Sequence, residues 1–104
     1  MKEITVQTLH SWREQGVEHT LIDVREPYER DVSDIGGVHI PMGEVLSRLA
    51  EIPTGHPVVV HCRSGSRSAA VTHALTSHGL DNVHNLSGGI TAWALAIDPN
   101  LEVA

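Results

Sequence analysis

The fold is decided by the stretch Val58-Val59-Val60-His61-Cys62-Arg63-Ser64-Gly65-Ser66-Arg67-Ser68-Ala69-Ala70. It begins with an apolar, β-branched run, passes through a short polar segment and ends in small residues that suit a helix. Apolar runs without polar alternation are typical of strands that are covered on both faces of a sheet. The stretch therefore predicts a buried strand, a tight loop and a helix, with Cys62 at the carboxyl end of the strand.

The remainder of the chain repeats this alternation of strands and helices. Further strands are predicted at 20–24 and 82–86, and shorter ones at 4–6 and 38–40. Helices are predicted at 8–15, 42–52, 68–78 and 90–97. The first of these stops at Gly16, and the second places Val45, Leu46 and Leu49 on one face. The pattern predicts an α/β fold with a central parallel sheet of about five short strands and helices on both faces.

Length and composition limit the possible functions. The chain has 104 residues and no internal repeat, so we expect a single domain over residues 1–104. Its 13 acidic and 7 basic residues give a net charge of −6 and leave no basic stripe for nucleic acid or an anionic membrane surface. Apolar runs are far shorter than the ~20 residues of a membrane helix. The amino-terminal residues lack a secretory pattern, so the expected location is the cytosol.

The residues that follow Cys62 suggest an anion-binding loop. Small residues allow the backbone to curl so that successive N–H groups point at one spot, and the next helix adds the partial charge of its amino end. Two arginines add full charges. Such surroundings lower the pKa of a thiol and favour the thiolate, which is the nucleophile. We therefore interpret Cys62 as the catalytic residue, and the substrate-binding candidates are Arg63, Ser64, Gly65, Ser66, Arg67 and Ser68.

Several residues of this region also have simpler interpretations. Cys62 is the sole cysteine, and a lone buried thiol is often only a small hydrophobic residue. The two arginines and the Gly-Ser loop beside it favour the nucleophile. His61 precedes it on a strand, so its side chain is expected to pack below the loop rather than to act as a base. The eight histidines show no metal-binding spacing, so no metal site is predicted.

The loop resembles the active-site loop of rhodanese domains, and two other segments agree. Residues 21–29, Leu-Ile-Asp-Val-Arg-Glu-Pro-Tyr-Glu, resemble the Asp-Val-Arg signature of that family and the short acidic helix that follows it. Residues 86–93, Leu-Ser-Gly-Gly-Ile-Thr-Ala-Trp, resemble its Gly-Gly-x-x-x-Trp signature. The resemblance implies that Asp23 and Arg25 buttress the active face. Residues 33–41 depart from the Gly-His-Ile-Pro-Gly-Ala pattern of many members, so a different local backbone is expected there.

The resemblance implies a sulfurtransferase without a cofactor. The related cysteine-dependent phosphatases place five residues between cysteine and arginine, whereas four lie between Cys62 and Arg67, which favours sulfur over phosphate. The expected substrates are a small anionic sulfur donor, such as thiosulfate or a persulfide, and a cyanide, small-thiol or protein-thiol acceptor. A sulfur-relay protein is a possible partner. A binding module with little turnover stays open as the alternative, as does a phosphatase.

The carboxyl end of the chain resembles one particular set of rhodanese domains. Residues 97–101, Ile-Asp-Pro-Asn-Leu, resemble the ends of rhodanese domains that are fused to ubiquitin-activating-like sulfur-carrier enzymes. The chain can therefore be freestanding or part of a longer protein, and the sequence leaves both possibilities open.

Overall fold

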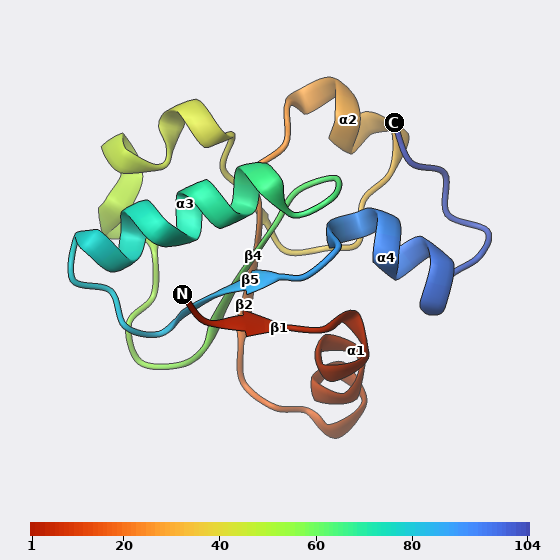
Figure 1. Cartoon of the computed structure of the whole chain (residues 1–104), viewed down its shortest axis with the longest axis horizontal. Helices are drawn as coiled ribbons and strands as arrows, with labels where there is room; N and C mark the ends of the chain where they lie inside the picture. The colour runs from red at the N-terminus through yellow and green to blue at the C-terminus, as the bar shows by residue number, and fades with distance from the viewer.

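A computed structural model describes residues 1–104 and contains one five-stranded sheet in which all strands are parallel (Figure 1). The spatial order is β1-β5-β4-β2-β3, and the strands are β1 (Glu3–Ile4), β2 (Thr20–Asp23), β3 (Val38–His39), β4 (Val58–His61) and β5 (Val83–Leu86). The α-helices are α1 (Val6–Gln15), α2 (Pro27–Val32), α3 (Ser66–Ser77) and α4 (Gly89–Ala96). The predicted α/β fold with a parallel sheet of about five strands is confirmed.

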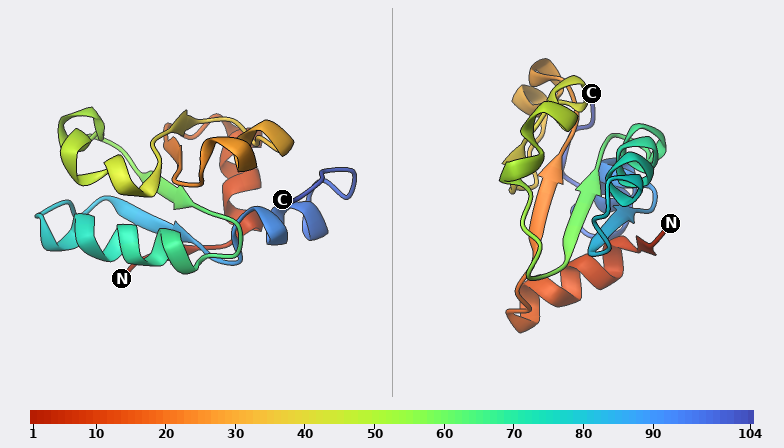
Figure 2. Two further views of the ribbon diagram at one scale, coloured as in Figure 1. Left: turned by 90° about the horizontal axis from the view of Figure 1, so that it is seen from above. Right: turned by 90° about the vertical axis from the view of Figure 1, so that its left-hand side faces the viewer.

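The sheet has an apolar core on each face, because side chains along a strand alternate between the two faces. On β4, Val58 and Val60 pack with Val71 and Leu75 of α3, and Cys62 belongs to this same core cluster. Val59 belongs to the opposite cluster, which contains apolar side chains of α1 and α4. The side views in Figure 2 show the helices lying on both sides of the strands. All four residues of β4 are buried, which explains its unbroken apolar sequence.

The helix α1 begins earlier than the sequence predicted. It starts at Val6 rather than at residue 8, and the first strand is reduced to Glu3–Ile4. The reason is a helix cap: the Thr5 side chain accepts a hydrogen bond from the Thr8 N–H at 3.1 Å, so Val6 already lies in the first turn. The predicted end is confirmed, since Gly16 adopts the left-handed conformation with φ of 69°.

The predicted helix at 42–52 is wrong in type. The chain forms two 3₁₀ helices instead, η1 (Met42–Glu44) and η2 (Leu46–Glu51). Arg48 leaves the helical region with φ of −120° and ψ of 27°, and its guanidinium is held by carboxylates three and four residues away. The predicted apolar face breaks as a result: Val45 is buried, but Leu46 is 51% exposed.

The helices α3 and α4 each begin slightly before their predicted starts. The helix α3 starts at Ser66, two residues earlier than predicted, and α4 starts at Gly89. Both follow a glycine in the left-handed conformation, Gly65 with φ of 108° and Gly88 with φ of 77°. The short helix implied after the Asp-Val-Arg segment is confirmed as α2. None of the helices combines the length and the apolar character that a bilayer crossing requires.

Candidate active site

The strand β4 brings Cys62 to the carboxyl edge of the sheet. It runs between β2 and β5 and ends at His61, so that Cys62 is the first residue beyond it. The residue is only 1% exposed. The carboxyl ends of parallel strands are where open α/β sheets form their sites. Cys62 thus occupies the predicted position at the base of the loop that enters α3.

Polar groups of the loop and of the first turn of α3 contact the Cys62 sulfur. The Gly65 N–H donates a hydrogen bond to Sγ at 3.2 Å, and the Ser68 N–H donates one at 3.4 Å. The Ser68 hydroxyl lies 3.3 Å from the same atom. These donors lie at the amino end of α3, where free N–H groups carry partial positive charge. The arrangement is an anion cradle centred on sulfur.

Asn85 on β5 supports this cradle from below. Its Oδ1 accepts a hydrogen bond from the Ser68 hydroxyl at 2.6 Å, and its Nδ2 donates to the Gly65 carbonyl at 3.3 Å. The single hydroxyl proton of Ser68 can be donated either to Asn85 or to a Cys62 thiolate, not to both. The two backbone N–H groups, whose direction does not depend on a rotating hydroxyl, therefore provide the constant part of the thiolate's stabilisation.

The cradle changes the acidity of Cys62. Burial by itself raises the pKa of the thiol, because it penalises the charged form. The hydrogen bonds from the side chain and backbone of Ser68 and from the backbones of Gly65 and Ser64 outweigh burial, and the pKa of Cys62 is lowered. The loop donors, rather than the guanidinium charges, are the leading causes of this shift.

We expect the alkylation of Cys62 by iodoacetamide to follow a pH profile whose inflection lies below that of a free thiol. Only the thiolate reacts, so the rate reports the ionised fraction, and the lowered pKa moves that fraction to lower pH. Alkylation reactions quenched at set times across a pH series give the rate at each pH, with the intact mass as the measure of product. Free cysteine is the control. An inflection at or above that of free cysteine would contradict the cradle.

The amino end of α4 holds the loop in this shape. The Ile90 N–H donates to the Cys62 carbonyl and the Thr91 N–H to the Arg63 carbonyl, both at 3.0 Å. These bonds turn the loop carbonyls outward and leave its N–H groups to face the sulfur. Gly89 permits the close approach, since a Cβ at this position would lie 2.5 Å from the Cys62 carbonyl oxygen. This contact explains the glycine at the first position of α4.

The two arginines of the loop have different surroundings. Arg63 is exposed, and its side chain forms no ion pair or hydrogen bond within the chain. The Arg67 guanidinium donates two hydrogen bonds to the Glu29 carboxylate of α2, at 2.7 and 2.8 Å. The Glu29 carboxylate, and to a smaller extent the Cys62 thiolate, raise the pKa of Arg67 above its usual range. Of the two, only Arg63 lacks an anionic partner, and it lies with Ser64 on the exposed part of the loop, which we call the mouth of the site.

A buried ion pair lies beneath the site. Arg25 is fully buried, and its Nη2 donates to the Asp23 carboxylate at 2.8 Å. The Arg25 Nε also donates to the Asp23 carboxylate. Its Nη1 donates to the Glu29 carbonyl and the Ser33 hydroxyl, and Nη2 donates to the Ser33 carbonyl. Desolvation raises the pKa of Asp23, but the bonds from Arg25 outweigh it and the pKa is lowered. The pair thus ties β2 to α2, in line with the buttressing role that the resemblance implied.

His61 packs below the loop, as predicted. It is fully buried, its Nδ1 lies 3.4 Å from the Cys62 carbonyl oxygen, and its Nε2 lies 3.9 Å from the Asp23 carboxylate. Burial lowers the pKa of His61 to about 4, so the ring is neutral at neutral pH. Neither ring nitrogen contacts the Cys62 sulfur, so the imidazole is placed to support the loop rather than to remove a proton from it.

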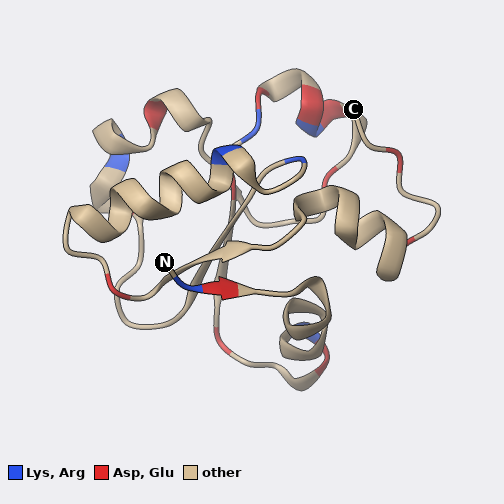
Figure 3. Ribbon diagram, viewed as in Figure 1, with Lys and Arg blue, Asp and Glu red and all other residues tan.

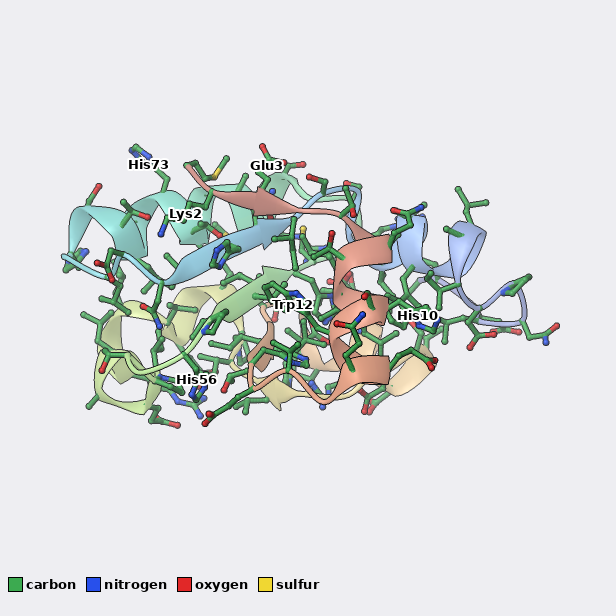
Figure 4. The ribbon with its side chains drawn as sticks, turned by 90° about the horizontal axis from the view of Figure 1, so that it is seen from below. Lys2, Glu3, His10, Trp12, His56 and His73 are labelled. Carbon is green, nitrogen blue, oxygen red and sulfur yellow. The ribbon has the colours of Figure 1, made fainter.

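The other histidines are dispersed over the fold. His10, His56 and His73 point away from one another from three separate segments (Figure 4). No group of three or more metal-ligating side chains is present.

The structure places the predicted site residues at unequal distances from the sulfur. Cys62, Gly65 and Ser68 form the buried centre, and the backbone of Ser64 acts on the sulfur from an exposed position. The other three predicted binding residues lie farther out: Arg63 and Ser66 are exposed, and Arg67 is turned toward α2.

Two residues of the site were missed as site residues. Glu29 belongs to the acidic helix segment in the sequence, and its pairing with Arg67 spans 38 residues. Asn85 lies in a predicted strand, and a polar residue within a buried strand is the signal that could have identified it.

The fold and the loop together define a class: a small parallel α/β domain that holds a single cysteine in a ring of N–H donors. The family model described as "Rhodanese-like domain" matches residues 5–96. The chain belongs to the rhodanese-like domain family. The resemblance seen in the three sequence motifs is thereby confirmed.

Several relatives and solved structures agree with this assignment. A sulfurtransferase of Allochromatium vinosum is 41% identical over 75 residues, which cover 71% of this chain and 70% of that protein. The probable adenylyltransferase/sulfurtransferase MoeZ of Mycobacterium tuberculosis is 37% identical over 94% of this chain, which spans only 26% of MoeZ. A rhodanese-like domain protein of Staphylococcus aureus superposes with a TM-score of 0.85 at 28% identity, covering 100% of this chain and 99% of that one.

Proposed function

We propose that the domain is a sulfurtransferase that carries sulfane sulfur as a persulfide on Cys62. The observation that carries this proposal is the ring of donors around the Cys62 sulfur, in which N–H groups of Gly65 and Ser68 lie 3.2 and 3.4 Å from Sγ. Such donors stabilise a thiolate before reaction and the negative charge on the outer sulfur after it. The substrate-binding role falls to the loop from Arg63 to Ser68.

The reaction takes place in two balanced steps. The Cys62 thiolate attacks the sulfane sulfur of thiosulfate, the S–S bond of thiosulfate breaks, and sulfite leaves with the bonding electron pair. The product is Cys62–S–S⁻. A cyanide, small-thiol or protein-thiol acceptor then attacks the outer sulfur, the new S–S bond breaks, and the Cys62 thiolate returns. No electron is gained or lost overall, and no cofactor is needed.

A protein acceptor or donor is part of the proposal. Cys62 is the sole cysteine, so no second thiol of this chain can resolve the persulfide. Relatives named as adenylyltransferase and sulfurtransferase proteins, such as MOCS3 of Aedes aegypti at 32% identity, support a sulfur-relay partner. The location that we propose is the cytosol, where thiols are kept reduced.

Intact mass after incubation with thiosulfate tests the function. The expected result is the gain of one sulfur atom, which cyanide removes with formation of thiocyanate. A binding module with little turnover would keep its original mass under the same conditions. A phosphatase would instead release phosphate from a phosphorylated substrate.

We expect Arg63→Ala to raise the KM for thiosulfate about tenfold with a smaller effect on kcat. Losing one charge-assisted contact to an anion costs about 1.5–3 kcal/mol, which corresponds to a factor of about ten or more. Arg67→Ala should also lower kcat, since its side chain anchors the first turn of α3 to Glu29. Steady-state kinetics with both variants measures the difference, with Arg48→Ala as the control for loss of an arginine away from the site.

An unchanged KM in Arg63→Ala would mean that thiosulfate is not held at this position. A persulfide delivered by a protein partner would then be the better candidate for the donor.

A further inference from the structure

We infer that Glu29 is a specificity-determining residue that selects singly charged sulfur donors by neutralising Arg67. The inference deepens the proposed function and rests on it for the choice of donor. The property concerned is the number of negative charges on a donor that the mouth of the site can bind. The donor class that it favours over the dianion thiosulfate is the monoanion that bears a terminal sulfane sulfur, such as a thiosulfonate or a persulfide.

Glu29 and Arg67 form a close ion pair. Both guanidinium Nη atoms of Arg67 bond to the two carboxylate oxygens, at 2.7 and 2.8 Å, so the pair is bidentate. The Glu29 side chain is only 5% exposed, whereas that of Arg67 is 35% exposed. A pair of opposite charges in such contact acts at a distance as a dipole, and its field decays faster than that of a single charge.

Contacts with both its side chain and its backbone hold Glu29 in place. Its carboxylate also accepts the Glu26 N–H at 3.2 Å, which closes the first turn of α2. Its carbonyl accepts a bond from the buried Arg25 at 3.4 Å. Glu29 is thus fixed from both its side chain and its backbone, and it cannot follow Arg67 if that side chain turns toward a bound anion.

The Glu29–Arg67 pair leaves one uncompensated positive charge in the loop. Figure 3 marks one basic residue at the start of α3, another at the tip of the loop before it, and acidic residues on α2. With Arg67 compensated, Arg63 is the loop cation that stays without an anionic partner. One cation matches one negative charge on the donor. The second charge of thiosulfate has no counterpart at the mouth.

The test that does not require turnover compares two alkylating agents. Iodoacetate and iodoacetamide react with the same Cys62 thiolate and differ by one negative charge. The ratio of their rates therefore reports the electrostatic potential at the mouth. In Glu29→Gln this ratio should rise about three- to tenfold at low salt, because Arg67 becomes an uncompensated cation, and the rise should shrink at 1 M salt.

Two further variants complete a charge cycle. Arg67→Gln should lower the ratio by a similar factor, and the double variant Glu29→Gln/Arg67→Gln should return within about twofold of the wild type, since its net charge is restored. Asp31→Asn, which removes an exposed acid from the same helix, is the matched control and should leave the ratio unchanged. A role limited to holding the loop in shape would slow both reagents in both single variants, with no return in the double variant.

The donor test uses thiosulfate and methanethiosulfonate, which carry two charges and one charge and both offer a terminal sulfane sulfur. With methanethiosulfonate, the Cys62 thiolate takes the outer sulfur and methanesulfinate leaves with the electron pair. In Glu29→Gln, kcat/KM for thiosulfate should rise several-fold relative to that for methanethiosulfonate, mainly through KM.

The experiments distinguish failure of the proposed sulfurtransferase function from failure of the inference on Glu29. If neither donor is turned over by the wild type, the proposed function is wrong, whereas the alkylation ratio still tests the charge of the mouth. If the ratio is the same in the wild type and both single variants, the inference on Glu29 is overturned even when sulfur transfer is intact. Should a variant fail to fold, Arg63→Gln in the wild-type background decides: its ratio should lose its salt dependence if Arg63 is the sole effective cation.

Discussion

Cys62→Ser is expected to abolish sulfur transfer while the domain remains folded. Cys62 is the sole thiol of the chain, and a serine hydroxyl at the same place is far too weak an acid to be ionised at neutral pH. The substitution keeps an acceptor for the Gly65 and Ser68 N–H groups, so the loop donors retain a partner. We expect the free energy of unfolding to change by no more than about 1 kcal/mol.

Two measurements on the same sample check this result. Thiocyanate formation from thiosulfate and cyanide gives the activity, and circular dichroism with urea titration gives the folded state. Ser77→Ala, an exposed serine at the far end of α3, serves as the matched control. Activity in the folded Cys62→Ser variant would sink the persulfide mechanism.

Arg25→Ala is expected to lower the free energy of unfolding by about 3–5 kcal/mol, since it breaks a buried ion pair and leaves a buried charge without its partner. Arg25 and Asp23 are both fully buried, and their contacts join the end of β2 to α2. The loss includes the bonds that Arg25 donates to Ser33, which leave further buried acceptors unsatisfied. Such a loss is a large fraction of the total stability of a domain of this size.

Urea unfolding of Arg25→Ala and of Arg48→Ala makes the comparison. Arg48 also pairs with carboxylates, but its pairs are exposed on η2, and exposed pairs add little to stability. The double variant Asp23→Leu/Arg25→Leu should be more stable than Arg25→Ala, because it removes both buried charges. Equal losses of unfolding free energy in the two arginine variants would show that burial of the Asp23–Arg25 pair does not determine its contribution to stability.

Local sequence signals predicted the elements that depend on neighbouring residues. The apolar run of β4 and the small residues after Cys62 indicated a strand, a loop and a helix, and the structure contains them in that order. Gly16 indicated the end of α1, because a left-handed residue there needs no side chain. The prediction of one α-helix at 42–52 was wrong, since the chain forms two 3₁₀ helices there and leaves the helical region at Arg48.

The sequence by itself determined the parallel α/β fold, the family and the position of Cys62, because apolar periodicity and the three motifs are local properties of the chain. Only the tertiary structure decided which groups act on the sulfur and which charges remain free. Asn85 reaches the loop from a neighbouring strand, and Glu29 reaches Arg67 from a helix 38 residues away. Such contacts depend on the register of β4 against β5 and on the docking of α2, and no spacing along the chain encodes them. Two arginines that look equivalent in the sequence therefore differ in the folded domain, where one is neutralised and the other faces the solvent.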